Sequence, residues 1–137
     1  LFRSLVDNRL HTAIMNTQDL ENQVVNVRVH RQRPLLDPFS KAGLTDYGLD
    51  LLAKSEPAIF LYLSVGDFSE TIEEEFKMLA GEDIPPTRMD SRMLGVGSQI
   101  LRHLKVEKMR VHMTNPKPLK GIGGYGLEVV DTVSIQS

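Results

Sequence analysis

The sequence predicts a single compact α/β domain over residues 1–137, in which helices flank a mixed β-sheet. Three stretches of the chain lead to this fold class. Residues 89–105 repeat apolar side chains at three- and four-residue steps, which is the stripe of a helix that packs by one face. Residues 109–113 alternate apolar and polar side chains, as a half-buried strand does. Residues 57–63 are almost continuously apolar, which is typical of a strand buried on both faces.

The N-terminal part of the chain predicts a hairpin followed by a strand. Residues 1–17 are rich in apolar side chains on both sides of Asp7-Asn8, a pair that favours a tight turn. Residues 23–33 predict a strand with valines on one side and polar side chains on the other. The polar side chains are Asn26, Arg28 and His30. Residues 34–43 contain two prolines and predict a loop.

Three helices are predicted, over residues 44–55, 71–81 and 90–105. Thr45 is a candidate cap for the first, and Asp90 or Ser91 for the third, because short oxygen-bearing side chains accept bonds from the first free amides. Glutamates at the start of the second helix suit the positive end of its dipole. In the first helix, the side chains expected to face the core are those of Leu49, Leu52 and Ala53. A last strand is expected at residues 127–135.

Composition excludes several classes of function. The chain has no cysteine, so it has no disulfide, no thiolate metal site and no cysteine nucleophile. A formal net charge of -2 provides no field that attracts nucleic acid or an anionic membrane. Without an apolar run of about 18 residues or a signal-peptide pattern, a cytoplasmic location is expected. The chain begins with Leu1, and we expect it to be a piece of a longer protein.

Three segments carry a resemblance to one family. They read DSRMLGVGSQILRHLKVEKMR at 90–110, TNPK at 114–117 and GGYGLEVV at 123–130, after shorter matches VRVH at 27–30 and FLYL at 60–63. These segments resemble GTP cyclohydrolase II, which opens the riboflavin pathway using zinc and magnesium. In many bacteria that enzyme is fused behind 3,4-dihydroxy-2-butanone 4-phosphate synthase. The resemblance implies a GTP cyclohydrolase II-like fold.

The resemblance also implies that a zinc site has been lost. The family binds zinc through three cysteines, and in a gap-free alignment their positions fall on Arg33, Leu44 and Asp46. None of the three is a thiolate, and an arginine brings a permanent positive charge. No metal is therefore expected in this domain. A substitute site of His30, Asp37 and Asp46 is one interpretation of the nearby side chains; a surface histidine with solvated carboxylates is the other, and base rates favour it.

The family's contacts to guanine and phosphate are also altered in this sequence. The family's glutamate and arginine after the 60–63 strand give way to SVGDFSETIEEE, in which only Gly66 keeps the glycine pattern. The added carboxylates oppose a triphosphate. Farther on, the family's threonine falls on Met113 and its second basic residue on Pro118. The candidate nucleotide-binding residues that are left are Thr114, Lys117 and Lys120.

One catalytic pair of the family is matched. Asp90 and Arg92 align with the aspartate and arginine implicated there as proton acceptor and as nucleophile toward the α-phosphate. The pair also has a structural interpretation, in which Asp90 caps a helix and Arg92 pairs with a carboxylate. A basic run at the same end of the chain indicates either an anion site or a solvated face. It comprises Arg102, His103, Lys105, Lys108, Arg110, His112, Lys117 and Lys120.

Taken together, these residues predict a degenerate GTP cyclohydrolase II-like domain that is inactive on GTP. Its expected role is structural or modulatory, for a synthase domain fused in cis, and a homodimer is expected. Magnesium is left to that synthase, and neither nucleic acid nor membrane is an expected partner. The alternative is an active nucleotide-binding or hydrolytic enzyme with an altered, zinc-independent site built on Asp90 and Arg92.

Overall fold

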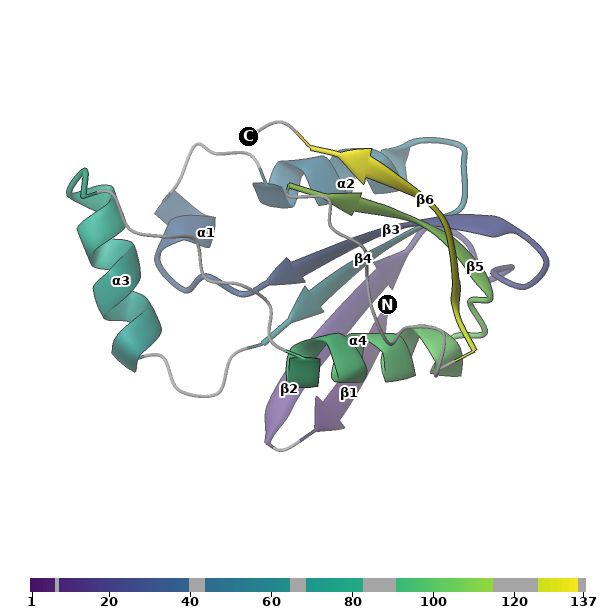
Figure 1. The fold of residues 1–137 in the computed structure, drawn as a ribbon, viewed down its shortest axis with the longest axis horizontal. Coiled ribbons are helices and arrows are strands. Elements are labelled where there is room, and N and C mark those ends of the chain that lie inside the picture. The colour runs from purple at the N-terminus through teal and green to yellow at the C-terminus, as the bar shows by residue number, and fades with distance from the viewer. Residues whose placement is uncertain (7, 40–43, 65–68, 83–90, 115–125, 136–137) are drawn as a thin grey trace.

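Four parallel strands form the centre of the fold, and a hairpin extends it on one side (Figure 1). A computed structural model describes residues 1–6, 8–39, 44–64, 69–82, 91–114 and 126–135. Within these residues, six strands make one mixed sheet in the order β1-β2-β4-β3-β5-β6. The strands are β1 (Phe2–Val6), β2 (Arg9–Met15), β3 (Val24–Arg31), β4 (Ala58–Leu63), β5 (Lys108–Met113) and β6 (Glu128–Ser134).

The helices of the described residues are α1 (Leu36–Phe39), α2 (Leu44–Ala53), α3 (Ser69–Leu79) and α4 (Ser91–His103). α2 packs with Gly48 against Phe60, and α4 packs with Gly97 against Leu61. Since neighbouring side chains of a strand point to opposite faces, α2 and α4 cover opposite faces of the sheet. Figure 1 shows α1 and α3 beyond the arrowheads of β3 and β4. No helix in the described ranges is long and apolar enough to cross a membrane.

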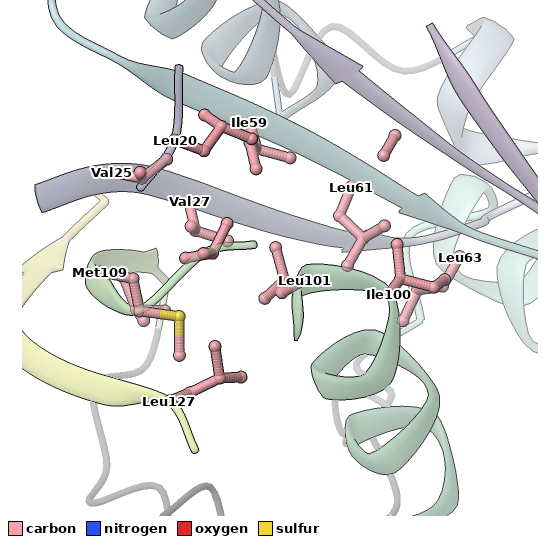
Figure 2. Close-up of a cluster of buried hydrophobic side chains, with 13 residues drawn as sticks. Leu20, Val25, Val27, Ile59, Leu61, Leu63, Ile100, Leu101, Met109 and Leu127 are labelled. Atoms are coloured by element: carbon pink, nitrogen blue, oxygen red, sulfur yellow. The ribbon is translucent and has the colours of Figure 1, made fainter. Parts of the chain in front are cut away.

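The apolar core lies between the sheet and α4 (Figure 2). The three central strands supply side chains that are almost fully buried, and α4 closes the layer with Ile100 and Leu101. The sheet residues of this layer are Val25, Val27, Ile59, Leu61, Leu63, Met109 and Val111. These residues account for the predicted patterns, because Val25 and Val27 of β3 belong to this layer while nearly every side chain of β4 is buried.

Most of the predicted elements are confirmed. The hairpin turns at Asn8, whose φ of 61° is the left-handed conformation that asparagine tolerates, and Val6 pairs with Arg9. The three predicted helices form within two residues of the expected bounds, and α4 begins at Ser91. The final strand is present as β6. Asp90, one of the two predicted caps of α4, lies outside the described residues.

Three local predictions were wrong. Residues 34–43 are not all loop, because α1 forms at Leu36–Phe39 with Asp37 in its first turn. Thr45 does not precede α2, which already begins at Leu44. The inward face of α2 is also rotated, because its closest approach to the sheet is through Gly48, where no side chain separates the helix from Phe60. Leu51 is therefore buried, whereas Leu49 and Ala53 are exposed.

The close approach at Gly48 gives a test of this packing. A methyl group at residue 48 overlaps the buried Phe60 ring, so we expect Gly48→Ala to lower the free energy of unfolding by about 1–3 kcal/mol. Gly97→Ala is the matched control, since its added carbon lies 3.4 Å from Leu61 and the helix gains about 1 kcal/mol of propensity. Urea unfolding measures both, and equal effects in the two variants would contradict the packing described.

Candidate functional site

The candidate site lies at the carboxyl edge of the parallel strands, which is where open α/β sheets bind ligands. Figure 1 shows the N-terminal end of α4 on the side toward which β3, β4 and β5 point. α1 follows β3 at this edge, and the exposed Thr114 follows β5. Arg92 is in the first turn of α4, so the fold brings its backbone to the same edge. The Arg92 side chain and the whole of Asp90, Lys117 and Lys120 lie outside the described residues.

The sheet face beneath α2 carries a buried polar layer next to this edge. β3 contributes three of its members, and strand register places His112 beside Arg28, Arg110 beside Asn26 and Tyr62 beside His30. Four of these side chains are less than one-tenth exposed: Asn26, Arg28, His30 and His112. The expected surface histidine at residue 30 was therefore wrong, because His30 is only 3% exposed. The expected half-buried β5 is likewise buried on both faces at His112.

Asp37 connects the polar layer to α1. Its Oδ1 lies 2.7 Å from His30 Nε2, and its Oδ2 accepts a bond from the Tyr62 hydroxyl at 2.5 Å. The Arg33 amide also donates to Oδ2, at 2.9 Å. Burial raises the pKa of Asp37, but hydrogen bonds from His30, Tyr62 and the Arg33 amide outweigh it and hold that pKa below its ordinary value. The carboxylate is thus fully engaged by protein donors.

A second carboxylate holds the other side of α1. Glu75 of α3 is 4% exposed, and its two oxygens accept bonds from the amides of Leu35 and Leu36 at 3.3 and 3.4 Å. These amides precede or begin a helix and lack partners within it. α1 is therefore fixed from two directions, by Asp37 and by Glu75. The sequence pattern gave no sign of this, because 39 or 40 residues separate the donors from the acceptor.

The suggested substitute metal site is not assembled in the described residues. His30 and Asp37 bind each other, whereas Asp46 is an exposed residue of α2. No group of three histidine, aspartate or glutamate side chains in the described part of the chain is placed to hold a metal ion. Of the positions that align with the family's zinc ligands, Arg33 contributes its backbone amide to the Asp37 network. The side chain at Leu44 lies outside the described set.

Arg28 is a candidate residue that the sequence interpretation missed. Its guanidinium is buried, its Nη1 donates to the His112 carbonyl at 3.3 Å, and its Nε has no hydrogen-bond partner. No carboxylate of the described residues forms an ion pair with it. Burial lowers the pKa of Arg28, and the nearby charge of Arg33 acts in the same direction. A buried cation without a counter-ion favours an anion as its ligand. The available signal was an arginine amid the apolar side chains of a central strand.

The basic run separates into two parts. Its helical members and the residues that follow them are exposed to solvent, as the solvated-face interpretation predicts; they are Arg102, His103, Lys105 and Lys108. Arg110 is half-buried and lies between Glu56, at 3.8 Å, and Asp131, at 3.6 Å. His112 faces the interior. The described part of the run therefore does not form one continuous anion-binding surface.

A family model described as GTP cyclohydrolase II matches residues 1–134. Over 98% of its length the chain is 28% identical to the riboflavin biosynthesis protein RibBA of Chlorobium phaeovibrioides, of which it covers 37%. Over the same share it is 30% identical to the probable bifunctional riboflavin biosynthesis protein RIBA 2, chloroplastic, of Oryza sativa subsp. japonica, of which it covers 27%. The chain thus spans about a third of the length of these relatives.

The Asp37 network has a measurable contribution to stability. Asp37→Asn weakens three hydrogen bonds at a partly buried site, and we expect the free energy of unfolding to fall by about 1–3 kcal/mol at neutral pH. Because the folded-state pKa of Asp37 is lowered, its contribution is present above about pH 4 and is lost as pH falls below that value. The free energy of unfolding of the variant should therefore fall less between neutral and acid pH than that of the wild type.

Urea unfolding between neutral pH and acid measures this change, with Asp46→Asn as the matched control on the exposed side of α2. The control should stay within about 0.5 kcal/mol of the wild type. Similar losses in both variants would show that the Asp37 network does not stabilise the fold as described.

Proposed function

The chain belongs to the GTP cyclohydrolase II family, and from this premise we propose that it is a degenerate member that does not open GTP. Its role in riboflavin biosynthesis is then structural or modulatory, exerted on a 3,4-dihydroxy-2-butanone 4-phosphate synthase domain in the same polypeptide. The observation that carries the proposal is the side-chain chemistry at the positions where the family holds its metal.

The residues at those positions do not fit zinc. The chain has no cysteine, and the aligned positions offer a guanidinium at Arg33, a hydrocarbon at Leu44 and one exposed carboxylate at Asp46. Zinc in proteins needs three or four thiolate, imidazole or carboxylate donors arranged together. The family's metal lowers the pKa of a bound water and so makes the nucleophile that attacks the purine ring. Without such a donor set, we derive no hydrolytic step for this chain.

The surrounding hydrogen bonds support the same proposal. His30 and Asp37 are the nearest residues able to bind a metal, but each is a partner of the other at 2.7 Å. Tyr62 and the Arg33 amide occupy the remaining carboxylate oxygen. A metal at this position would have to displace several bonds that also fix α1. α1 and Arg33 are therefore held by hydrogen bonds within the protein, which need no metal.

The names of the relatives support a partner domain in cis. One matched protein, from Photobacterium phosphoreum, is named 3,4-dihydroxy-2-butanone 4-phosphate synthase, and the chain covers 38% of it. Two matched plant proteins are named monofunctional riboflavin biosynthesis proteins. We propose that this domain stabilises or modulates a fused synthase, with magnesium belonging to that synthase, in a cytoplasmic homodimer.

Arg28 favours a second candidate function, a nucleotide-binding or hydrolytic enzyme with a zinc-independent site. In that case the buried guanidinium binds a phosphate, and Asp90 and Arg92 act on the nucleotide. This candidate requires binding of GTP or a related anion, which the degenerate domain does not.

Titration with GTP separates the two candidates. Calorimetry should find weak or no GTP binding, and a parallel assay with zinc and magnesium supplied should detect neither formate nor pyrophosphate release. The missing activated water and the missing guanine acceptor together remove the terms that catalysis and specificity need.

Arg92→Ala and Arg28→Met are the informative variants, with the exposed Arg102→Met as their control. Turnover by the wild type that disappears in Arg92→Ala would contradict the degenerate-domain proposal. GTP binding that is lost in Arg28→Met, but kept in Arg102→Met, would support the second candidate.

A further inference from the structure

Three hydrogen-bonded side chains join α2 to the sheet. The Tyr47 hydroxyl of α2 lies 2.7 Å from His112 Nδ1 on β5, and His112 Nε2 lies 3.0 Å from Asn26 Oδ1 on β3. The amide nitrogen of Asn26 donates to Glu56 and to the Pro57 carbonyl, so its oxygen faces the histidine. Nε2 must therefore carry a proton, and the neutral ring accepts the Tyr47 hydroxyl at Nδ1.

These hydrogen bonds attach the N-terminal half of α2 to the sheet. The C-terminal end of the helix is held separately by Asn16, whose amide nitrogen donates to the carbonyls of Leu52, Lys54 and Glu56 at 2.8–3.2 Å. Between the two attachments, Gly48 contacts the Phe60 ring. Arg28 is the register neighbour of His112, the residue that Tyr47 contacts, and it lies on the sheet face that α2 covers. The N-terminal half of α2 thus covers the buried cation of the candidate site.

The surroundings of His112 oppose a second proton on its ring. Burial lowers the pKa of His112, and the charges of Arg110 on β5, Lys54 after α2 and Arg28 on β3 act in the same direction. Glu56 alone acts to raise it, and its side chain is 67% exposed. A tyrosine hydroxyl can turn to accept a bond, so hydrogen-bond geometry is not the obstacle. The obstacle is a charge buried among like charges.

We propose that the Tyr47–His112–Asn26 chain is a proton-sensitive latch, which holds the N-terminal half of α2 over Arg28 at neutral pH and releases it when His112 gains a proton. With α2 released, the imidazole is hydrated and takes up its proton near its ordinary pKa of about 6.5. Since the docked ring has the lower pKa, docking is fully favoured above this value and weakens as pH falls below it. The proposal does not depend on whether the domain acts on GTP.

Hydrogen exchange on the full chain tests the latch. Exchange rates of α2 amides, corrected for the intrinsic pH effect, are compared with those of β4 amides from about pH 7.5 to about pH 5. We expect α2 protection to fall relative to β4 by up to about tenfold for each pH unit below about 6.5. Protection that falls equally in α2 and β4 would mean global unfolding and would overturn the proposal.

Variants identify the responsible group. His112→Gln keeps a donor and an acceptor but does not titrate, so the relative loss of α2 protection should disappear. The matched control is His103→Gln, an exposed histidine of α4, which should respond to pH like the wild type. His11 also has a lowered pKa through burial and Arg9, but it bonds the Ser64 amide near β4. A response of α2 that persists in His112→Gln would overturn the proposal.

Tyr47→Phe is a second test, and it does not depend on whether the protein folds with a substitution at residue 112. It removes the hydroxyl bond and leaves the Phe-like ring in place, so α2 should exchange faster than in the wild type already at neutral pH. Unchanged α2 protection in Tyr47→Phe would contradict the latch.

Discussion

The structure depends on one constraint: β3 is buried on both faces, although one face is polar. The valine face packs in the apolar core, and Asn26, Arg28 and His30 on the other face are also less than one-tenth exposed. A buried polar group without a partner costs about 1–3 kcal/mol, so the segments around this face must supply partners. α1 supplies Asp37 and α2 supplies Tyr47. The local architecture of the carboxyl edge follows from satisfying this one strand.

The same constraint bears on function. In the region where the family holds a metal, the polar groups of this chain are paired among themselves. The Asp37 carboxylate, for example, accepts three hydrogen bonds. Arg28 is the exception, with a guanidinium nitrogen that has no partner and no ion pair in the described part of the chain. The domain therefore combines a paired set of polar groups around α1 with one buried cation, Arg28, that has no counter-ion among the described residues. The first property supports the loss of metal chemistry, and the second is where an anion would still be favoured.

The sequence predicted the elements better than it predicted the site. Periodicity was sufficient for β4 and α4, because their burial follows from side-chain spacing within one segment. It misplaced the inward face of α2, which depends on the fit of Gly48 to Phe60. It also missed the burial of His30 and Arg28, whose surroundings come from α1, α2 and β5. The bond from Arg28 to His112 spans 84 residues, and no local pattern encodes it. Asp90, Lys117 and Lys120 lie outside the described residues, so their predicted roles stay predictions.

The proposed degenerate domain requires that hydrogen bonds of the protein take the place of a metal at the carboxyl edge. The most direct measurement is the zinc content of the protein after purification without chelator and dialysis against zinc. NMR of the same sample records the imidazole resonances of His30. The account predicts no stoichiometric zinc and an unchanged His30 environment, because Asp37 already occupies its Nε2. One zinc per chain, with a shift of the His30 resonances that is absent in His30→Gln, would contradict it.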